Sequence, residues 1–148
     1  MASSFRCARV SLSNSLTAGV LALIDHLSPP DGLCHGDPNP GNVIMTKDGA
    51  RLIDWIAAIR APAEFDLASA HVILTELAPH LADDPERPRA VNAALQAAYA
   101  DLAGTSPTAL AASVKPYLPV VRALLLLGGA IPAQSARLVQ RLESDFPA

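Results

Sequence analysis

Apolar residues recur at helical spacing over most of the chain, and this pattern predicts a mainly helical protein. The first helix is expected over 11–27, where leucine, isoleucine and valine return every three or four positions until Pro29-Pro30 stops it. Ser11 or Ser13 can cap this helix. Further helices are expected over 65–77, from 84 or 88 to 103, over 107–114, from 116 to 127 with an interruption at Pro119, and from 132 onward.

One short stretch breaks the helical pattern. The run from Val43 to Thr46 has the β-branching and length of a strand, and Lys47-Asp48-Gly49 forms a turn in which Gly49 can take a positive φ. Ala50 to Asp54 is then the returning strand. The predicted fold class is therefore mostly α with one embedded β-hairpin (α+β), preceded by a disordered tail over 1–10.

Composition narrows the class of protein further. The chain has 148 residues, enough for one domain, and its aromatic content of 4% predicts a core of aliphatic helix packing. The net charge is −3 and no basic run occurs, which argues against a nucleic-acid partner. The most apolar stretch, Ala123–Ala133, is well short of the ~20 residues of a transmembrane helix, so no membrane span is expected.

The two cysteines, Cys7 and Cys34, lack the spacing of a zinc or redox motif. We expect free thiols in a reducing compartment, and therefore a cytoplasmic protein. Cys34 directly precedes His35, which allows a nucleophile. A buried cysteine at an apolar strand position before a loop is the favoured interpretation.

The segment LCHGDPNPGNVIMTKDGARLIDW, residues 33–55, holds the densest set of chemically capable side chains. Two prolines stiffen the loop between Asp37 and Asn42. A hairpin would bring Asn42, before its first strand, close to Asp54, at the end of its second. An amide oxygen beside a carboxylate suits Mg²⁺, which also takes waters and phosphate oxygens. Asp37 is then free to act as a base.

These residues follow a known order. His35-Gly36-Asp37-x-x-x-x-Asn42, then Ile53-Asp54-Trp55 and Asp66-Leu67-Ala68, resembles the aminoglycoside phosphotransferase family, which are small-molecule kinases with a protein-kinase-like fold. The resemblance covers about residues 33–68. It implies that 11–148 is a helical phosphotransferase catalytic lobe, the C-terminal lobe of that fold, with its catalytic loop and hairpin at 33–55.

The resemblance also implies a role for each matched residue. Asp37 would be the catalytic base, and Asn42 and Asp54 would bind the Mg²⁺ that bridges the phosphates of ATP. His35 would shape the loop without binding metal. Asp66 would either tie its helix to the catalytic loop or act as a helix-start carboxylate favoured by the helix dipole; the sequence leaves both open.

Some features of the family are missing. Ile56 stands where an acidic residue is common, and Ile59-Arg60-Ala61 where glycines are common. No glycine-rich loop precedes the motif, and both lysines, Lys47 and Lys115, follow it. We therefore expect the N-terminal ATP-binding lobe to be absent, so that the chain is truncated, receives the lobe from a separate polypeptide, or no longer transfers phosphate.

Two functions remain. The first is Mg-ATP-dependent phosphorylation of a hydroxyl on a small molecule, weak or inactive in this chain alone; the alternative is a non-catalytic binding or regulatory remnant. Ordinary turn chemistry of Asp and Asn, and a metal-dependent phosphoesterase, explain the motif less well. Self-association through an uncovered apolar surface is also expected. An acidic set could hold a cationic substrate or form a solvated face: Glu64, Glu76, Asp83, Asp84 and Glu86.

Overall fold

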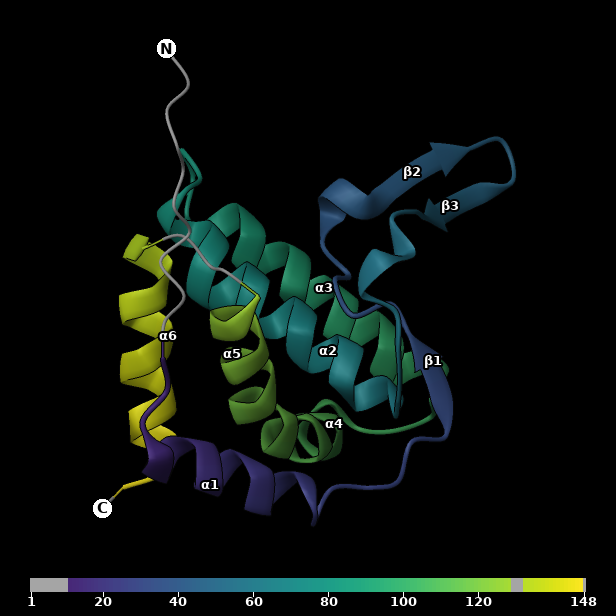
Figure 1. The fold of residues 1–148 in the computed structure, drawn as a ribbon. Coiled ribbons are helices and arrows are strands. Elements are labelled where there is room, and N and C mark those ends of the chain that lie inside the picture. The colour runs from purple at the N-terminus through teal and green to yellow at the C-terminus, as the bar shows by residue number, and fades with distance from the viewer. Residues whose placement is uncertain (1–10, 129–131, 148) are drawn as a thin grey trace. The chain divides into compact units, whose positions relative to one another are not determined.

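The computed structural model describes residues 11–128 and 132–147, so the predicted tail over 1–10 lies outside the described residues. The chain divides into two compact units, one of residues 27–118 and one that combines 1–26 with 119–148. Figure 1 shows the elements of both, and each unit is described by itself below.

The larger unit contains two small antiparallel sheets. Strand β2 (Val43–Thr46) pairs with β3 (Gly49–Leu52) to form the predicted hairpin, in which Val43 lies opposite Leu52. The hydroxyl of Thr46 donates to the carbonyl of Gly49 at 2.8 Å and accepts from the N–H of Asp48 at 3.2 Å, which closes the turn. The hairpin prediction is confirmed, and Gly49 has the expected positive φ, 107°.

A second two-stranded sheet accompanies the hairpin, and the sequence pattern did not predict it. Strand β1 (Gly32–Cys34) pairs with β4 (Ile59–Ala61), which lies in a stretch that reads as a connector. The two strands are three residues long and far apart in sequence, so no local pattern marks them. Their pairing brings the start of the loop over 35–42 next to the start of the following helix. We keep the name catalytic loop for this segment, after the role that the resemblance implies.

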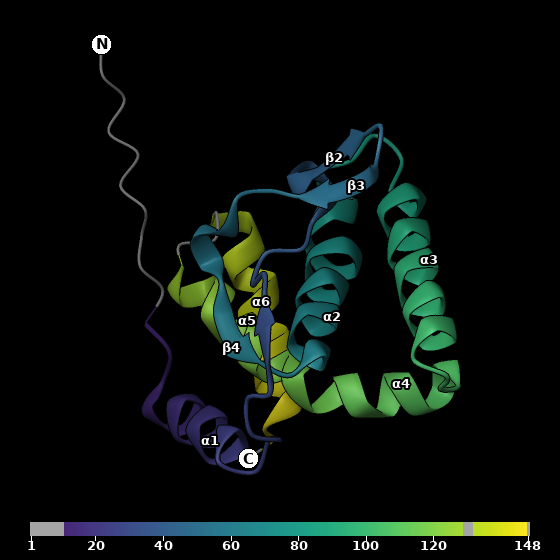
Figure 2. The same cartoon turned by 90° about the vertical axis from the view of Figure 1, so that its right-hand side faces the viewer.

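Helices fill the rest of this unit. In chain order they are two 3-10 turns (Pro40–Asn42 and Trp55–Ala57), α2 (Ala63–His71), a π-helical segment (Val72–Leu77), a third 3-10 turn (Ala78–His80), α3 (Glu86–Leu102), α4 (Pro107–Val114) and a fourth 3-10 turn (Lys115–Tyr117). The predicted helix over 65–77 thus changes to π geometry after His71, whose carbonyl accepts a hydrogen bond from the Thr75 hydroxyl at 2.8 Å. In Figures 1 and 2, α2 and α3 run beside each other, and the side chain of Gln96 on α3 donates to the carbonyl of Leu67 on α2 at 3.1 Å.

The core of the larger unit is mainly aliphatic, as the composition predicts. α2 is buried on most of its sides, whereas α4 buries one face, that of Leu110 and Val114. The buried apolar side chains include Phe65, Leu67, Val72, Leu74, Leu77, Leu110, Val114 and Tyr117. The fold class is accordingly mostly helical with small antiparallel sheets.

The described part of the smaller unit contains the helices α1 (Asn14–Ile24), α5 (Leu118–Leu127) and α6 (Pro132–Asp145). Of the two candidate caps, Ser13 is the N-cap of α1, because its hydroxyl accepts a hydrogen bond from the N–H of Leu16 at 3.3 Å. The buried guanidinium of Arg122 forms an ion pair with Asp145, which joins α5 to α6. A side chain at Gly19 would meet the ring of Phe146 at 2.9 Å, so a glycine lets these segments approach closely.

Pro119 does not interrupt the helical chain as predicted. The segment Pro107–Leu127 is helical throughout, because Pro116 lies in a 3-10 turn and Pro119 in the first turn of α5, where its missing N–H has no partner to lose. This segment is long and apolar enough to cross a membrane by length and composition, whereas the sequence pattern predicted none. Half of its most apolar window is buried inside the protein, and a core helix passes the same test, so this is weak evidence for a span.

The end of α3 offers a test of local backbone strain. Gly104 follows the helix with φ 65°, and the N–H of Thr105 donates to the carbonyl of Ala100 at 2.9 Å. A Cβ at Gly104 would meet no atom within 4 Å, so only the left-handed backbone penalises a side chain there. We expect Gly104→Ala to lower the free energy of unfolding in urea by about 1–2 kcal/mol. Gly104→Asn should lose less, and equal stability of all three proteins would contradict the left-handed conformation.

Candidate active site

The catalytic loop between β1 and β2 holds the side chain of Asp37 by two amides. Asn39 Nδ2 donates to Asp37 Oδ1 at 2.9 Å, and Asn42 Nδ2 donates to Asp37 Oδ2 at 3.0 Å. Asn39 itself is fixed, because its Oδ1 accepts from the N–H of Gly41 at 2.8 Å. The carboxylate is half-buried and held in one orientation. A general base needs such a fixed orientation toward the proton that it accepts.

The side chain of Asn42 is oriented by the same contacts. Its Nδ2 also donates to the backbone carbonyl of Asp37 at 2.9 Å, and both atoms of Asp37 that it contacts can only accept. The amide nitrogen must therefore face Asp37. The Oδ1 atom is then directed elsewhere, and none of the described hydrogen bonds uses it.

His35 joins the loop to the end of the hairpin. The ring is buried, with 1% of its surface exposed. Its Nδ1 accepts from the N–H of Asp37 at 3.3 Å, and its Nε2 donates to the carbonyl of Ile53 at 2.7 Å. Trp55 covers the ring edge-on, with centroids 4.8 Å apart. Both ring nitrogens are thus engaged by backbone groups, and neither is left for a metal.

Asp54 follows Ile53 in an unusual conformation. Its φ of 63° makes it the one non-glycine residue with positive φ among 11–128 and 132–147. This conformation costs about 1–2 kcal/mol. Its exposed carboxylate takes part in none of the described hydrogen bonds. The N–H of Ile53 donates to the carbonyl of Asn42 at 2.9 Å, so the backbone at Asp54 is adjacent to Asn42, as the hairpin predicts.

Asp66 anchors the whole loop to α2. Its Oδ2 accepts from the N–H of His35 at 2.6 Å and its Oδ1 accepts from the N–H of Gly36 at 2.8 Å. It also lies in the first turn of α2, near the positive end of the helix dipole. The structure therefore confirms that Asp66 ties its helix to the loop. The alternative, a carboxylate favoured by the helix dipole, applies to the same position and does not conflict with the tie.

The residues that could hold a divalent cation are Asn42 and Asp54. Both have an oxygen outside the described hydrogen bonds, and Mg²⁺ commonly takes only one or two protein carboxylates, completing its shell with waters and phosphates. Within the described part of the chain, no group of three or more His, Cys, Asp or Glu residues forms a fuller metal site. The donor set therefore fits a cation shared with a phosphate ligand better than a closed structural site.

Comparison with known proteins gives one decisive match. The sequence model of the phosphotransferase enzyme family matches residues 9–117, which include every site residue described above. The chain belongs to the phosphotransferase enzyme family. The resemblance seen in the motif is thereby confirmed, and membership indicates phosphotransferase chemistry in general. No curated protein and no solved structure matches the chain significantly.

Two features of this phosphotransferase site were missed from sequence. Gly36 has φ 81°, and a Cβ on it would lie 2.2 Å from the carbonyl oxygen of Ala57, so only glycine fits between the loop and the residues after Asp54. Asn39 orients Asp37, although it reads as an ordinary turn residue. The position of Asn39 between two prolines is the one signal that marks it in the sequence.

Cys34 has the features of a buried thiol. It is 3% exposed, and its Sγ–H lies 3.4 Å from the carbonyl of Ala61 and 3.2 Å from that of Pro62. Burial raises the pKa of the thiol, and the nearby negative charge of Asp66 raises that pKa further. A thiol held protonated is a poor nucleophile, which argues against catalysis by Cys34.

The acidic residues considered for a cationic substrate have local roles where hydrogen bonds are described. Asp84 Oδ1 accepts from the N–H of Glu86 at 3.0 Å, at the start of α3. Glu86 in turn pairs with Arg89 at 2.6 Å on the surface. These two carboxylates therefore support the first turn of α3, and Glu64 lies instead in the first turn of α2.

The anchoring role of Asp66 can be separated from its effect on the helix dipole. We expect Asp66→Asn to lower the free energy of unfolding by about 1.5–3 kcal/mol, because an amide cannot accept from both loop N–H groups. The amide protons of His35 and Gly36 should exchange faster with solvent, measured by hydrogen exchange. Glu64→Gln, in the same helical turn, removes a similar dipole interaction and should change stability by about 0.5 kcal/mol. Equal losses in both variants would contradict the anchor.

The protonated state of Cys34 predicts slow alkylation. In a Cys7→Ser background, iodoacetamide at pH 8 should label the native protein on the order of tenfold more slowly than the urea-unfolded chain, because the thiolate is the reactive form. Since the folded pKa is raised, the unfolded thiol ionises first as pH increases. The contribution of Cys34 to stability is therefore present below the unfolded pKa and is lost as pH rises above it. Similar labelling rates for native and unfolded chains would contradict the burial.

Proposed function

We propose that this chain supplies the base and the metal ligands of a Mg-ATP-dependent phosphotransferase that acts on a hydroxyl of a small molecule, and that its helices form the C-terminal lobe of a protein-kinase-like fold. The observation that carries this proposal is the joint placement of Asp37, Asn42 and Asp54. One loop and one hairpin bring them together, and His35 and Asp66 hold that loop and hairpin in register.

In the proposed reaction, Asp37 orients the acceptor hydroxyl and takes up its proton as the oxygen attacks the terminal phosphorus of the nucleotide. The bond between that phosphorus and the leaving diphosphate breaks in the same transfer. The amides of Asn39 and Asn42 keep the carboxylate pointing in one direction. Such positioning contributes a large part of catalysis in phosphoryl transfer, where little covalent chemistry is required of the protein.

Asn42 Oδ1 and the carboxylate of Asp54 are the proposed ligands of Mg²⁺, which would neutralise charge on the phosphates. The strained backbone of Asp54 supports this role, because non-glycine residues with positive φ concentrate at functional sites. His35 fixes the residue before Asp54 and thereby limits how far the carboxylate can move.

The residues of this sequence do not include a glycine-rich loop, and Lys47 and Lys115 both follow the catalytic loop. We therefore expect nucleotide affinity in this chain alone to be weak and dependent on the metal ligands. A non-catalytic binding remnant is the competing function, and nucleotide binding separates the two.

The test is titration calorimetry of the chain with ATP in the presence and absence of Mg²⁺. Asp54→Asn removes the charge but tolerates the left-handed backbone, so it isolates the ligand role from strain. We expect binding that depends on Mg²⁺ and weakens at least about tenfold in Asp54→Asn, or about 1.4 kcal/mol.

Asp48→Asn is the matched control, because Asp48 is an exposed aspartate in the turn of the same hairpin. This variant should bind as the unchanged protein does. Binding that is equal in Asp54→Asn and in the unchanged protein would contradict the ligand role. The absence of binding in all three proteins would favour the non-catalytic remnant.

A further inference from the structure

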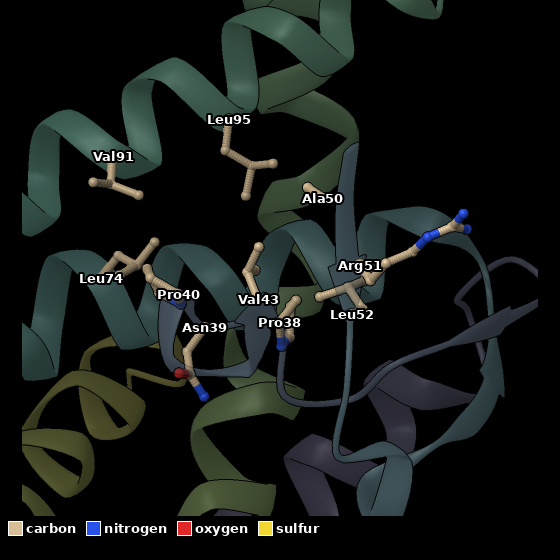
Figure 3. A pocket seen from close by; sticks show the side chains of 10 residues that line it. All are labelled: Pro38, Asn39, Pro40, Val43, Ala50, Arg51, Leu52, Leu74, Val91 and Leu95. Atoms are coloured by element: carbon tan, nitrogen blue, oxygen red, sulfur yellow. The ribbon is translucent and has the colours of Figure 1, made fainter. Parts of the chain in front are cut away.

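An apolar cavity lies directly beside the catalytic loop, within the larger unit. Its volume is about 610 Å³, in the range of pockets that hold small molecules. Figure 3 shows its wall, which comes from the loop, the inner face of the hairpin, the π-helical segment and α3. The lining residues that carry the argument are Pro38, Val43, Leu52, Leu74, Val91 and Leu95.

The hairpin contributes one face to this cavity. Val43 and Leu52 are opposite each other in the register, so their side chains lie on the same face of the sheet. Ala50 shares that face because side chains alternate along a strand, and it also lines the cavity. Ile44 is on the opposite face and does not belong to the lining.

The helical side of the cavity is equally apolar. Val91 and Leu95 lie one turn apart on α3 and point toward the hairpin (Figure 3), and they remain 40% and 38% exposed. Leu74, in the π-helical segment, forms the bottom of the cavity. In the same segment the hydroxyl of Thr75 donates to the carbonyl of His71. Partly exposed aliphatic side chains that converge on one concave space are typical of a ligand site.

The polar residues in the lining are turned away from this space. The guanidinium of Arg51 points away from the other lining side chains in Figure 3. Both polar atoms of the Asn39 side chain are already used, by Asp37 and by the N–H of Gly41. The cavity therefore offers no charge and no free hydrogen-bonding side chain to the body of a ligand.

A second cavity of about 580 Å³ adjoins the first, since Pro38, Leu52 and Leu95 line both. Three carboxylates line this second cavity and none lines the first: Asp31, Glu64 and Asp66. Asp66 is already engaged by the loop, Glu64 lies at the start of α2, and Asp31 precedes β1. The cavity next to the catalytic loop is thus apolar, and the acidic residues line only the second cavity, on the other side of Leu52 and Leu95.

We propose that the apolar cavity binds the body of a hydroxyl compound with an aliphatic or ring skeleton, and that it does not accept a polycation. Burial of apolar surface is the interaction that this lining can supply, and a desolvated ammonium group would find no partner there. The proposal rests on the proposed function and extends it, because Pro38, which lines the cavity, directly follows Asp37, the proposed base.

The test uses a neutral fluorescent probe, N-phenyl-naphthylamine, titrated into the full chain without nucleotide. We expect saturable binding that menthol, a neutral ring alcohol, displaces and that spermine, a polycation, does not. Leu95→Asp should weaken probe binding at least about tenfold, since it places a charge in the apolar wall. Ala50→Trp should have a similar effect by filling the space without adding charge.

Two controls separate the cavity from general surface effects. Leu102→Asp introduces the same charge at an 89% exposed leucine at the end of the same helix, outside the lining. Ile44→Trp introduces the same ring on the opposite face of the hairpin. Both controls should bind the probe as the unchanged protein does, and circular dichroism of all four variants verifies that they fold.

Three results would contradict the proposed ligand class. Displacement by spermine would assign a cationic ligand, and equal losses in Leu95→Asp and Leu102→Asp would mean that the probe binds elsewhere. A folded Ala50→Trp variant that binds normally would exclude the cavity. If probe binding behaves as expected but Mg-ATP does not bind, the ligand class of the cavity stands and only its role as the acceptor site fails.

Discussion

The carboxylate of Asp66 is the contact on which the site depends. It accepts two backbone N–H groups, from His35 and Gly36, and so fixes the start of the catalytic loop on the first turn of α2. Hydrogen bonds to a charged acceptor are stronger than those between neutral groups, and loss of the acceptor would leave two loop donors without a partner. The loop is therefore positioned by a helix that belongs to the core, and its geometry depends on the packing of that helix.

From this anchor, a chain of short contacts reaches the groups proposed to act on substrate. His35 connects the loop to the carbonyl of Ile53, and the N–H of Ile53 connects back to Asn42. Asp54 comes next, in a strained left-handed conformation that these neighbours maintain. The close approach of Gly36 to Ala57 completes the arrangement, because any side chain at Gly36 would push the two segments apart. The result is a preorganised set of oxygen atoms with few internal partners.

The apolar cavity follows from the same architecture. The stiff loop supplies Pro38, and the hairpin, held beside the loop by Asn42, turns Val43 and Leu52 toward α3. The proposed base and an apolar recess thus share one short stretch of chain. In a phosphotransferase this arrangement would let binding energy from the body of a substrate position its hydroxyl.

The sequence by itself determined the local elements and the family. Periodicity marked the helices and left Ser11 and Ser13 as alternative caps of the first one. β-branching and Gly49 marked the hairpin, and the ordered motif from His35 to Asp66 identified a phosphotransferase, now confirmed by the match over 9–117. The helices and the hairpin depend on neighbours within a few positions, and the motif depends on the order of its residues along the chain. A pattern records both directly.

The tertiary structure decided the rest. The pairing of β1 with β4, the two hydrogen bonds at Asp66, the hydrogen bond between His35 and Ile53 and the apolar recess all join residues far apart in the chain. Whether a long-range contact is stable depends on the loop that it closes and on the packing around both segments. The local spacing of either residue therefore does not reveal its partner. For this reason the sequence named the residues of the site, and only the packed helices showed which atoms remain available for chemistry.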